Sequence, residues 1–131
     1  GNARRFEVTP RVQFVACDLL PPHHAGLPTD LHFDLICANL PYIPTRTLRD
    51  LKVFGREPTL ALDGGADGLG PIRRLLSLTT DWLAPNGRIL LEIEATLGVQ
   101  ALSLAFDLFH QAEIHLHQDL TGRDRLLEIQ F

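Results

Sequence analysis

Methionine is missing from the sequence altogether, since none of the 131 residues is Met and the chain opens with Gly1. Because translation normally starts with Met, we expect Gly1 not to be the native start and the chain to be a piece of a longer protein. Cysteine is scarce as well: Cys17 and Cys37 each stand alone inside an apolar run. Two isolated cysteines are not a disulfide framework, and we expect both to be reduced, buried thiols.

An excess of basic charge is also absent. The chain has 12 Lys and Arg against 16 Asp and Glu, a net charge of −4. This balance argues against proteins that coat nucleic acid or anionic membranes, so we expect no stable nucleic-acid binding. No run approaches the roughly 18 apolar residues of a membrane span, and the N-terminus has no secretory pattern. We therefore expect a cytoplasmic protein with no membrane partner, and the 45% of apolar residues indicates a globular domain.

The first part of the chain contains two apolar runs that predict β-strands. They cover residues 11–17, ending on Asp18, and residues 33–38, ending on Asn39. A proline-rich loop over residues 21–28 separates them, and we expect its His23 and His24 to face solvent.

The second part predicts alternating helices and strands. After a weak short helix near residues 47–53, apolar spacing and Pro71 indicate a helix from about residue 71, with apolar positions at Ile72, Leu75, Leu76, Leu78, Trp82 and Leu83. A turn over residues 85–87, a strand over 88–94 and another helix follow, whose expected buried face is Val99, Leu102, Leu104, Ala105, Leu108 and Phe109. Strands over 113–118 and 125–131 predict a closing hairpin. The order predicts an α/β sheet with an antiparallel edge.

The segment Asn39-Leu40-Pro41-Tyr42 directly follows a predicted strand, where ligands of open α/β sheets bind. The Asn39 side-chain carbonyl and the Leu40 backbone carbonyl are two acceptors that suit an NH₂ group. Pro41 restricts Leu40 to an extended conformation, and the Tyr42 ring offers a flat face to a planar amide or base. The alternative is a proline turn that only caps a buried strand.

Several segments together resemble one family. Asn39-Leu40-Pro41-Tyr42 resembles the (Asn/Asp)-Pro-Pro-Tyr motif of S-adenosylmethionine-dependent methyltransferases that modify amide or exocyclic amino nitrogens. Residues 56–69 resemble the Glu-Pro, Ala-Leu, Gly-Gly, Asp-Gly-Leu signature of the HemK (PrmC) family, whose members methylate a glutamine side-chain amide in peptide chain release factors. Residues 88–94 and 119–125 resemble that family's next strand and its closing hairpin.

The resemblance implies a Rossmann-like class I methyltransferase sheet with a C-terminal antiparallel hairpin. It implies S-adenosylmethionine as cofactor, a release factor as protein substrate, and no metal. The implied catalytic residues are Asn39, Leu40, Pro41 and Tyr42; the implied cofactor contacts are Asp18, Leu19 and Asn39; and the implied substrate contacts are Asn39, Pro41, Tyr42 and Glu57.

The family's glycine-rich cofactor loop and first two strands have no counterpart here. We therefore expect residues 1–131 to be the C-terminal portion of one catalytic domain, with any N-terminal helical domain also absent. In the family, the two absent strands lie between the strands expected at residues 12–17 and 33–38. We expect the isolated chain to bind S-adenosylmethionine weakly or not at all, and its unpaired strands to favour self-association.

Other interpretations stay open. Leu40 departs from the family's Pro, and Asn-Leu-Pro-Tyr also resembles the motif of ribosomal RNA adenine dimethyltransferases. A third possibility is a non-catalytic sheet fragment. Asp18 is alternatively a polar strand end, and Glu57 a turn carboxylate. We expect Asp67 to cap the next helix rather than bind calcium, and His115 and His117 to share a strand face without a third metal ligand.

Overall fold

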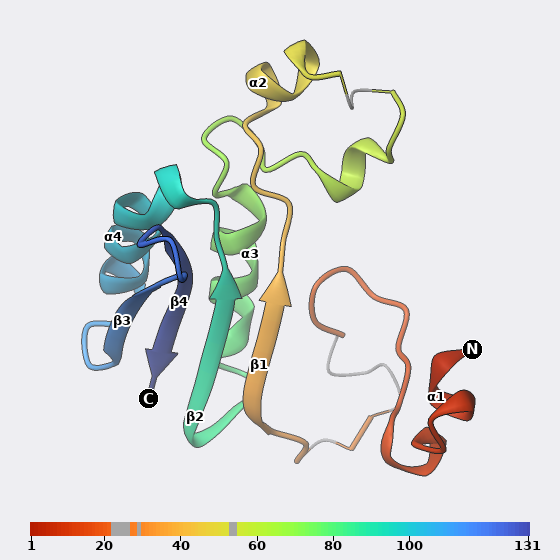
Figure 1. Cartoon of the computed structure of the whole chain (residues 1–131). Coiled ribbons are helices and arrows are strands. Elements are labelled where there is room, and N and C mark those ends of the chain that lie inside the picture. The colour runs from red at the N-terminus through yellow and green to blue at the C-terminus, as the bar shows by residue number, and fades with distance from the viewer. Residues whose placement is uncertain (22–26, 29, 53–54) are drawn as a thin grey trace. The chain divides into compact units, whose positions relative to one another are not determined.

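The computed structural model describes residues 1–21, 27–28, 30–52 and 55–131 (Figure 1). The chain divides into two compact units, Gly1–Asp30 and Leu31–Phe131, and each is described by itself. His23 and His24 lie outside the described residues, so the expectation that they face solvent stays a prediction.

The first unit contains helix α1 (Asn2–Arg5) and the 3-10 helix η1 (Thr9–Arg11). The strand predicted over residues 11–17 is wrong, because residues 12–17 have no regular secondary structure. A strand needs a neighbour for its backbone N–H and C=O groups, and the described part of this unit contains no other strand.

The second unit is built on a four-stranded sheet in the order β1-β2-β4-β3 (Figure 1). Its strands are β1 (Phe33–Asn39), β2 (Leu83–Glu92), β3 (Glu113–Gln118) and β4 (Asp124–Gln130). β1 runs parallel to β2, whereas β4 is antiparallel to both β2 and β3. The predicted α/β sheet with a C-terminal antiparallel hairpin is confirmed.

The predicted turn over residues 85–87 lies inside β2 as a bulge. While β1 advances from Phe33 to Leu35, its partner β2 advances from Leu83 to Arg88. Asn86 has a φ of 63°, which suits the turn-like backbone of this bulge. Regular pairing begins at Arg88, where the sequence predicted the strand to begin.

One face of the sheet is buried. Ile36 of β1 pairs with Ile89 of β2, which in turn pairs with Ile129 of β4, and Ile89 and Ile129 are completely buried. Neighbouring residues point to the opposite face because side chains alternate along a strand. Cys37 is therefore exposed rather than buried, and Cys17 of the first unit is exposed too; both thiols are free.

Helices α2 (Thr45–Asp50), α3 (Gly70–Thr79) and α4 (Gly98–Leu108), with the 3-10 helices η2 (Thr59–Ala61) and η3 (Ala95–Leu97), complete the second unit. α3 begins with proline in its first turn and buries Ile72, Leu75 and Leu76, as predicted, although Leu78 is 39% exposed. No helix in the described part of the chain is long and apolar enough to span a membrane.

The buried face of α4 agrees with the prediction only in part. Ala105 and Phe109 are buried as predicted, but Val99 is 72% exposed and Leu108 41% exposed, and Ala101 is completely buried although it was not predicted to be. α4 packs against α3, β3 and β4. Ala101 lies one turn before Ala105 on the same helix face, where its small side chain lets the helix lie close to its neighbours.

Candidate functional site

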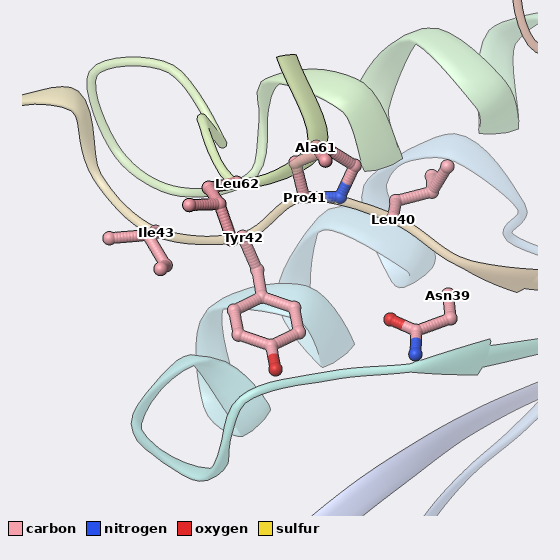
Figure 2. A pocket seen from close by; sticks show the side chains of 7 residues that line it. All are labelled: Asn39, Leu40, Pro41, Tyr42, Ile43, Ala61 and Leu62. Carbon is pink, nitrogen blue, oxygen red and sulfur yellow. The ribbon is translucent and has the colours of Figure 1, made fainter. Parts of the chain in front are cut away.

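The candidate site lies where β1 ends and the chain turns away from the sheet. A small pocket of about 110 Å³ opens there, lined by Asn39, Leu40, Pro41, Tyr42, Ile43, Ala61 and Leu62 (Figure 2). The structure therefore brings together the four residues of the predicted motif. This volume is below the several hundred Å³ of typical small-molecule sites and suits a group of side-chain size.

The Asn39 carboxamide has a defined orientation. Its Nδ2 donates a hydrogen bond to Glu92 Oε2 at 3.0 Å. Figure 2 shows the amide nitrogen directed toward β2 and the amide oxygen on the side of the Tyr42 ring. A carbonyl oxygen on that side is available to accept a hydrogen bond from a bound group.

The second wall of the pocket comes from the segment that leads into α3. Ile43 N donates to Leu62 O at 3.1 Å, and Gly64 N donates to Ile43 O at 2.8 Å. An isolated parallel bridge between Ile43 and Asp63 results. Backbone hydrogen bonds thus hold together two segments that lie about twenty residues apart in the sequence.

Two glycines of the Asp-Gly-Gly-Ala-Asp-Gly segment lie directly against the Tyr42 backbone. A Cβ on Gly64 would be 2.6 Å from the Tyr42 carbonyl carbon, and one on Gly68 would be 2.6 Å from the Tyr42 carbonyl oxygen. No side chain fits at those distances. Gly68 also has a φ of +80°, which favours glycine. The signature therefore has a packing role: it holds the backbone that carries Tyr42.

Asp63 fastens the same junction through its carboxylate. Its Oδ1 accepts hydrogen bonds from Thr45 Oγ1 at 2.7 Å and from Gly65 N at 2.9 Å. These two donors, the Thr45 hydroxyl first, hold the pKa of Asp63 below its usual value. The hydrogen-bond donors of this turn therefore stabilise the ionised form of Asp63.

Asp67 lies before α3 but does not occupy its N-cap, which is Leu69. The prediction that Asp67 caps this helix is corrected: its Oδ1 accepts from Leu69 N at 3.0 Å, and its Oδ2 pairs with Arg73 at 2.8 Å. The Arg73 guanidinium, followed by the Leu69 N–H, lowers the pKa of Asp67. The carboxylate connects the glycine-rich turn to the first turn of the helix.

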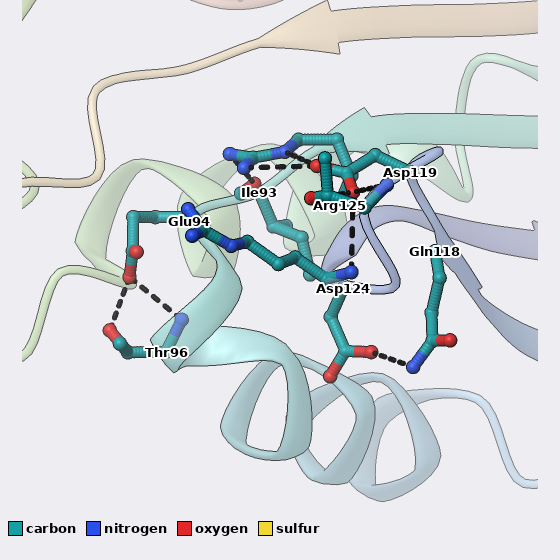
Figure 3. A network of polar contacts seen from close by, with 9 residues as sticks. Ile93, Glu94, Thr96, Gln118, Asp119, Asp124 and Arg125 are labelled. Carbon is teal, nitrogen blue, oxygen red and sulfur yellow. Dashed lines mark hydrogen bonds and ion pairs between the residues drawn. The ribbon is translucent and has the colours of Figure 1, made fainter.

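The closing hairpin uses a carboxylate in its turn (Figure 3). Asp119 Oδ1 accepts from the Thr121 hydroxyl at 2.6 Å and from Thr121 N at 2.8 Å, and Arg123 N adds a third bond at 3.2 Å. These donors lower the pKa of Asp119 to about 2. Arg125 also donates to Ile93 O at 3.4 Å, which ties the hairpin to the segment after β2.

His115 and His117 share one face of β3, as predicted. His115 Nε2 lies 2.9 Å from Glu113 Oε1, and His117 Nε2 lies 2.7 Å from Glu128 Oε2. Across the residues that the structure describes, no group of three or more His, Cys, Asp or Glu side chains is arranged to hold a metal ion. Each histidine is engaged with a carboxylate of the sheet.

Three predicted site residues are not among the residues that line the pocket. Asp18 and Leu19 belong to the first unit, where Leu19 has a φ of 66°. Glu57 is exposed and is not among the residues that line the pocket. The roles of Asp18 and Leu19 toward a cofactor, and of Glu57 toward a substrate, stay predictions.

The sequence reasoning missed Glu92 as a partner of Asn39. The two are Cα partners across the parallel pair of β1 and β2. The signal was available in part, because Glu92 is a charged residue between the apolar residues Leu91 and Ile93. The register that sets it beside Asn39 is a long-range property that the sequence did not reveal.

The arrangement can hold a planar NH₂ group. It offers an oriented carbonyl oxygen at Asn39, a backbone carbonyl at Leu40 and an aromatic face at Tyr42 around a volume of side-chain size. In the described residues that line it there is no cysteine, serine or histidine to act as a nucleophile or base. Its residues are suited to binding and orienting an amide.

Comparison with known proteins finds relatives that share one name. A release factor glutamine methyltransferase of Thermosynechococcus vestitus is 44% identical over 96 residues, which are 70% of this chain and 32% of the relative. That of Moorella thermoacetica is 38% identical over 125 residues, 95% of this chain and 42% of the relative. That of Rhodopirellula baltica is 34% identical over 131 residues, with shares of 98% and 43%.

No protein-family model matches the chain. A solved structure titled protein-(glutamine-N5) methyltransferase (release factor-specific), from Alicyclobacillus acidocaldarius, has 14% identity and a TM-score of 0.45 and covers 77% of this chain and 82% of that one. The chain spans between 32% and 43% of the length of the three curated relatives described above. By its sequence identity to these relatives, the chain belongs to the family of release factor glutamine methyltransferases.

Proposed function

We propose that this chain is the acceptor-binding portion of an S-adenosylmethionine-dependent methyltransferase catalytic domain, which methylates a glutamine side-chain amide in a peptide chain release factor. The oriented Asn39 carboxamide at the end of β1 carries the proposal. The printed names of the relatives support the substrate class. The encounter with the release factor is expected in the cytoplasm.

An amide nitrogen is a weak nucleophile because its lone pair is delocalised into the carbonyl. Its attack on a methyl group therefore depends on orientation, which the site supplies. Asn39 Oδ1 and the Leu40 carbonyl each accept one N–H of the amide, and both stabilise the positive charge that grows on the nitrogen during attack. The Tyr42 ring packs on the amide plane and excludes water.

The described residues fit the acceptor amide but not the whole cofactor. S-adenosylmethionine supplies an electrophilic methyl group and its own leaving group, so the chain needs no nucleophile of its own. The pocket of about 110 Å³ is well below the several hundred Å³ of typical cofactor sites. We therefore expect the 131-residue chain alone to bind S-adenosylmethionine weakly or not at all; calorimetry that finds micromolar affinity would contradict this.

The test is a methyl-transfer assay with radiolabelled cofactor on the full-length protein that carries this sequence. Release factor and ribosomal RNA are offered as separate acceptors. Asn39→Ala should lower transfer to the release factor by about 100-fold or more, the scale of losing one charge-stabilising group, with little change in cofactor affinity. Asn2→Ala, a change in α1, is the matched control and should leave transfer unchanged. Label in the RNA instead of the protein would overturn the substrate assignment.

A further inference from the structure

We propose that Glu92 is a positioning residue for methyl transfer: it selects the one orientation of the Asn39 carboxamide that can accept the substrate N–H. This inference rests on the proposed function. It starts from the hydrogen bond of 3.0 Å that Asn39 Nδ2 donates to Glu92 Oε2. Figure 2 shows the consequence, with the Asn39 oxygen turned away from β2 and toward the side of Tyr42.

A carboxamide has two orientations related by a half-turn, and they exchange its donor and acceptor ends. An ionised carboxylate can only accept hydrogen bonds. Beside Glu92, the half-turned orientation would bring the Asn39 oxygen against a carboxylate oxygen and would aim its NH₂ at the NH₂ of a bound glutamine. Both contacts are repulsive. A carboxylate at this position therefore excludes the unproductive orientation, which an amide in its place would not do.

The backbone that carries Glu92 is rigid. Its neighbours Leu91 and Ile93 are both completely buried, and Leu91 is paired with Leu127 of β4. Glu92 and Asn39 are Cα partners, so their side chains leave the same face of neighbouring strands. The acceptor thus comes from a central strand and not from a mobile loop, as orientation control requires.

The same hydrogen bond would also exist if it only fastened the end of β1, and a double-mutant experiment separates the two roles. A residue that acts through Asn39 has no further effect once the Asn39 carboxamide is gone. A residue that stabilises the strand end has the same effect in either background. The variants are Glu92→Gln, Asn39→Ala and their combination in the full-length protein, with Glu113→Gln as a control of equal charge change on the same sheet face.

We expect Glu92→Gln to lower kcat for release factor methylation by roughly tenfold, the loss of one charge-assisted orienting bond, with KM for S-adenosylmethionine unchanged. In the Asn39→Ala background the same change should have no effect, and Glu113→Gln should have none in either. In the 131-residue chain, the NMR signal of the Asn39 side-chain NH₂, identified by its loss in Asn39→Ala, should move in Glu92→Gln and stay in Glu113→Gln.

The outcomes distinguish the two proposals. Full activity of Asn39→Ala would overturn the proposed function itself. If Asn39→Ala is impaired but Glu92→Gln keeps its kcat, only the positioning role fails. An equal loss from Glu92→Gln in both backgrounds would assign the residue to strand stability and would also overturn the positioning role.

Discussion

Two short apolar runs of this chain have similar composition but adopt different structures. Residues 12–17 and residues 33–38 both have β-favouring composition. Each run is followed by a polar residue that is a candidate for chemistry, Asp18 and Asn39 respectively. Only β1 forms a strand, because β2 lies beside it in parallel register. A β-favouring sequence therefore forms a strand only where a neighbouring strand is available to pair with it.

The largest expected effect comes from a charge in the run that does form a strand. Ile36 of β1 is 7% exposed, so Ile36→Asp should lower the free energy of unfolding by about 3 kcal/mol or more, since it buries an unpaired carboxylate. Val15, 39% exposed, is the matched position in the other run, and Val15→Asp should change stability by less than about 0.5 kcal/mol. Urea unfolding followed by the backbone NMR signals of each unit measures both. Equal losses would mean that residues 12–17 are as well packed as β1.

A smaller effect is expected in the segment that follows β1. Gly64→Ala would set a Cβ 2.6 Å from the Tyr42 backbone, and such overpacking typically costs about 1–3 kcal/mol. Gly55→Ala is the control, because no atom of the described residues lies within 4 Å of the added Cβ and only the φ of +78° disfavours alanine. The comparison separates a clash from backbone strain. If Gly64→Ala is no worse than Gly55→Ala in urea, the glycine contact does not hold Tyr42.

Acid should have a modest effect on the second unit, through Asp119. Because its pKa is lowered to about 2 from 3.8, the folded state holds fewer protons than the unfolded state between those values. The stability it contributes is therefore complete above pH 4 and is lost as the pH falls toward 2. The urea midpoint should drop over that range, and less so in Asp119→Asn. Asp107→Asn, at an exposed position of α4, should keep the wild-type pH dependence.

Much of the second unit could be predicted from local pattern. The alternation in β3 and the turn residues before β4 predicted the hairpin, and Pro71 marked the first turn of α3. The buried face of α4 could be predicted only in part. Ala105 and Phe109 are buried as expected, whereas Val99 and Leu108 are exposed and the small residue Ala101 is buried.

The candidate site was predictable only in part. The motif from Asn39 to Tyr42 stood out because it follows a strand, and the structure brings these residues together around one pocket. The roles of Glu92 and Gly64 could not be predicted, because they depend on strand register and on contacts between distant parts of the chain. Those contacts join residues far apart in sequence, and no local rule supplies them.

The junction at Ile43 and Asp63 affects how much the length of the segment between them can vary. Thr45 Oγ1 donates a hydrogen bond to Asp63 Oδ1, and Ile43 N donates one to Leu62 O. The segment between residues 45 and 62 therefore begins and ends at the same place. The entropy of closing a loop grows only with the logarithm of its length, so doubling it costs about 0.6 kcal/mol. Insertions in this segment can therefore change the surface beside the pocket while the pocket itself keeps its shape.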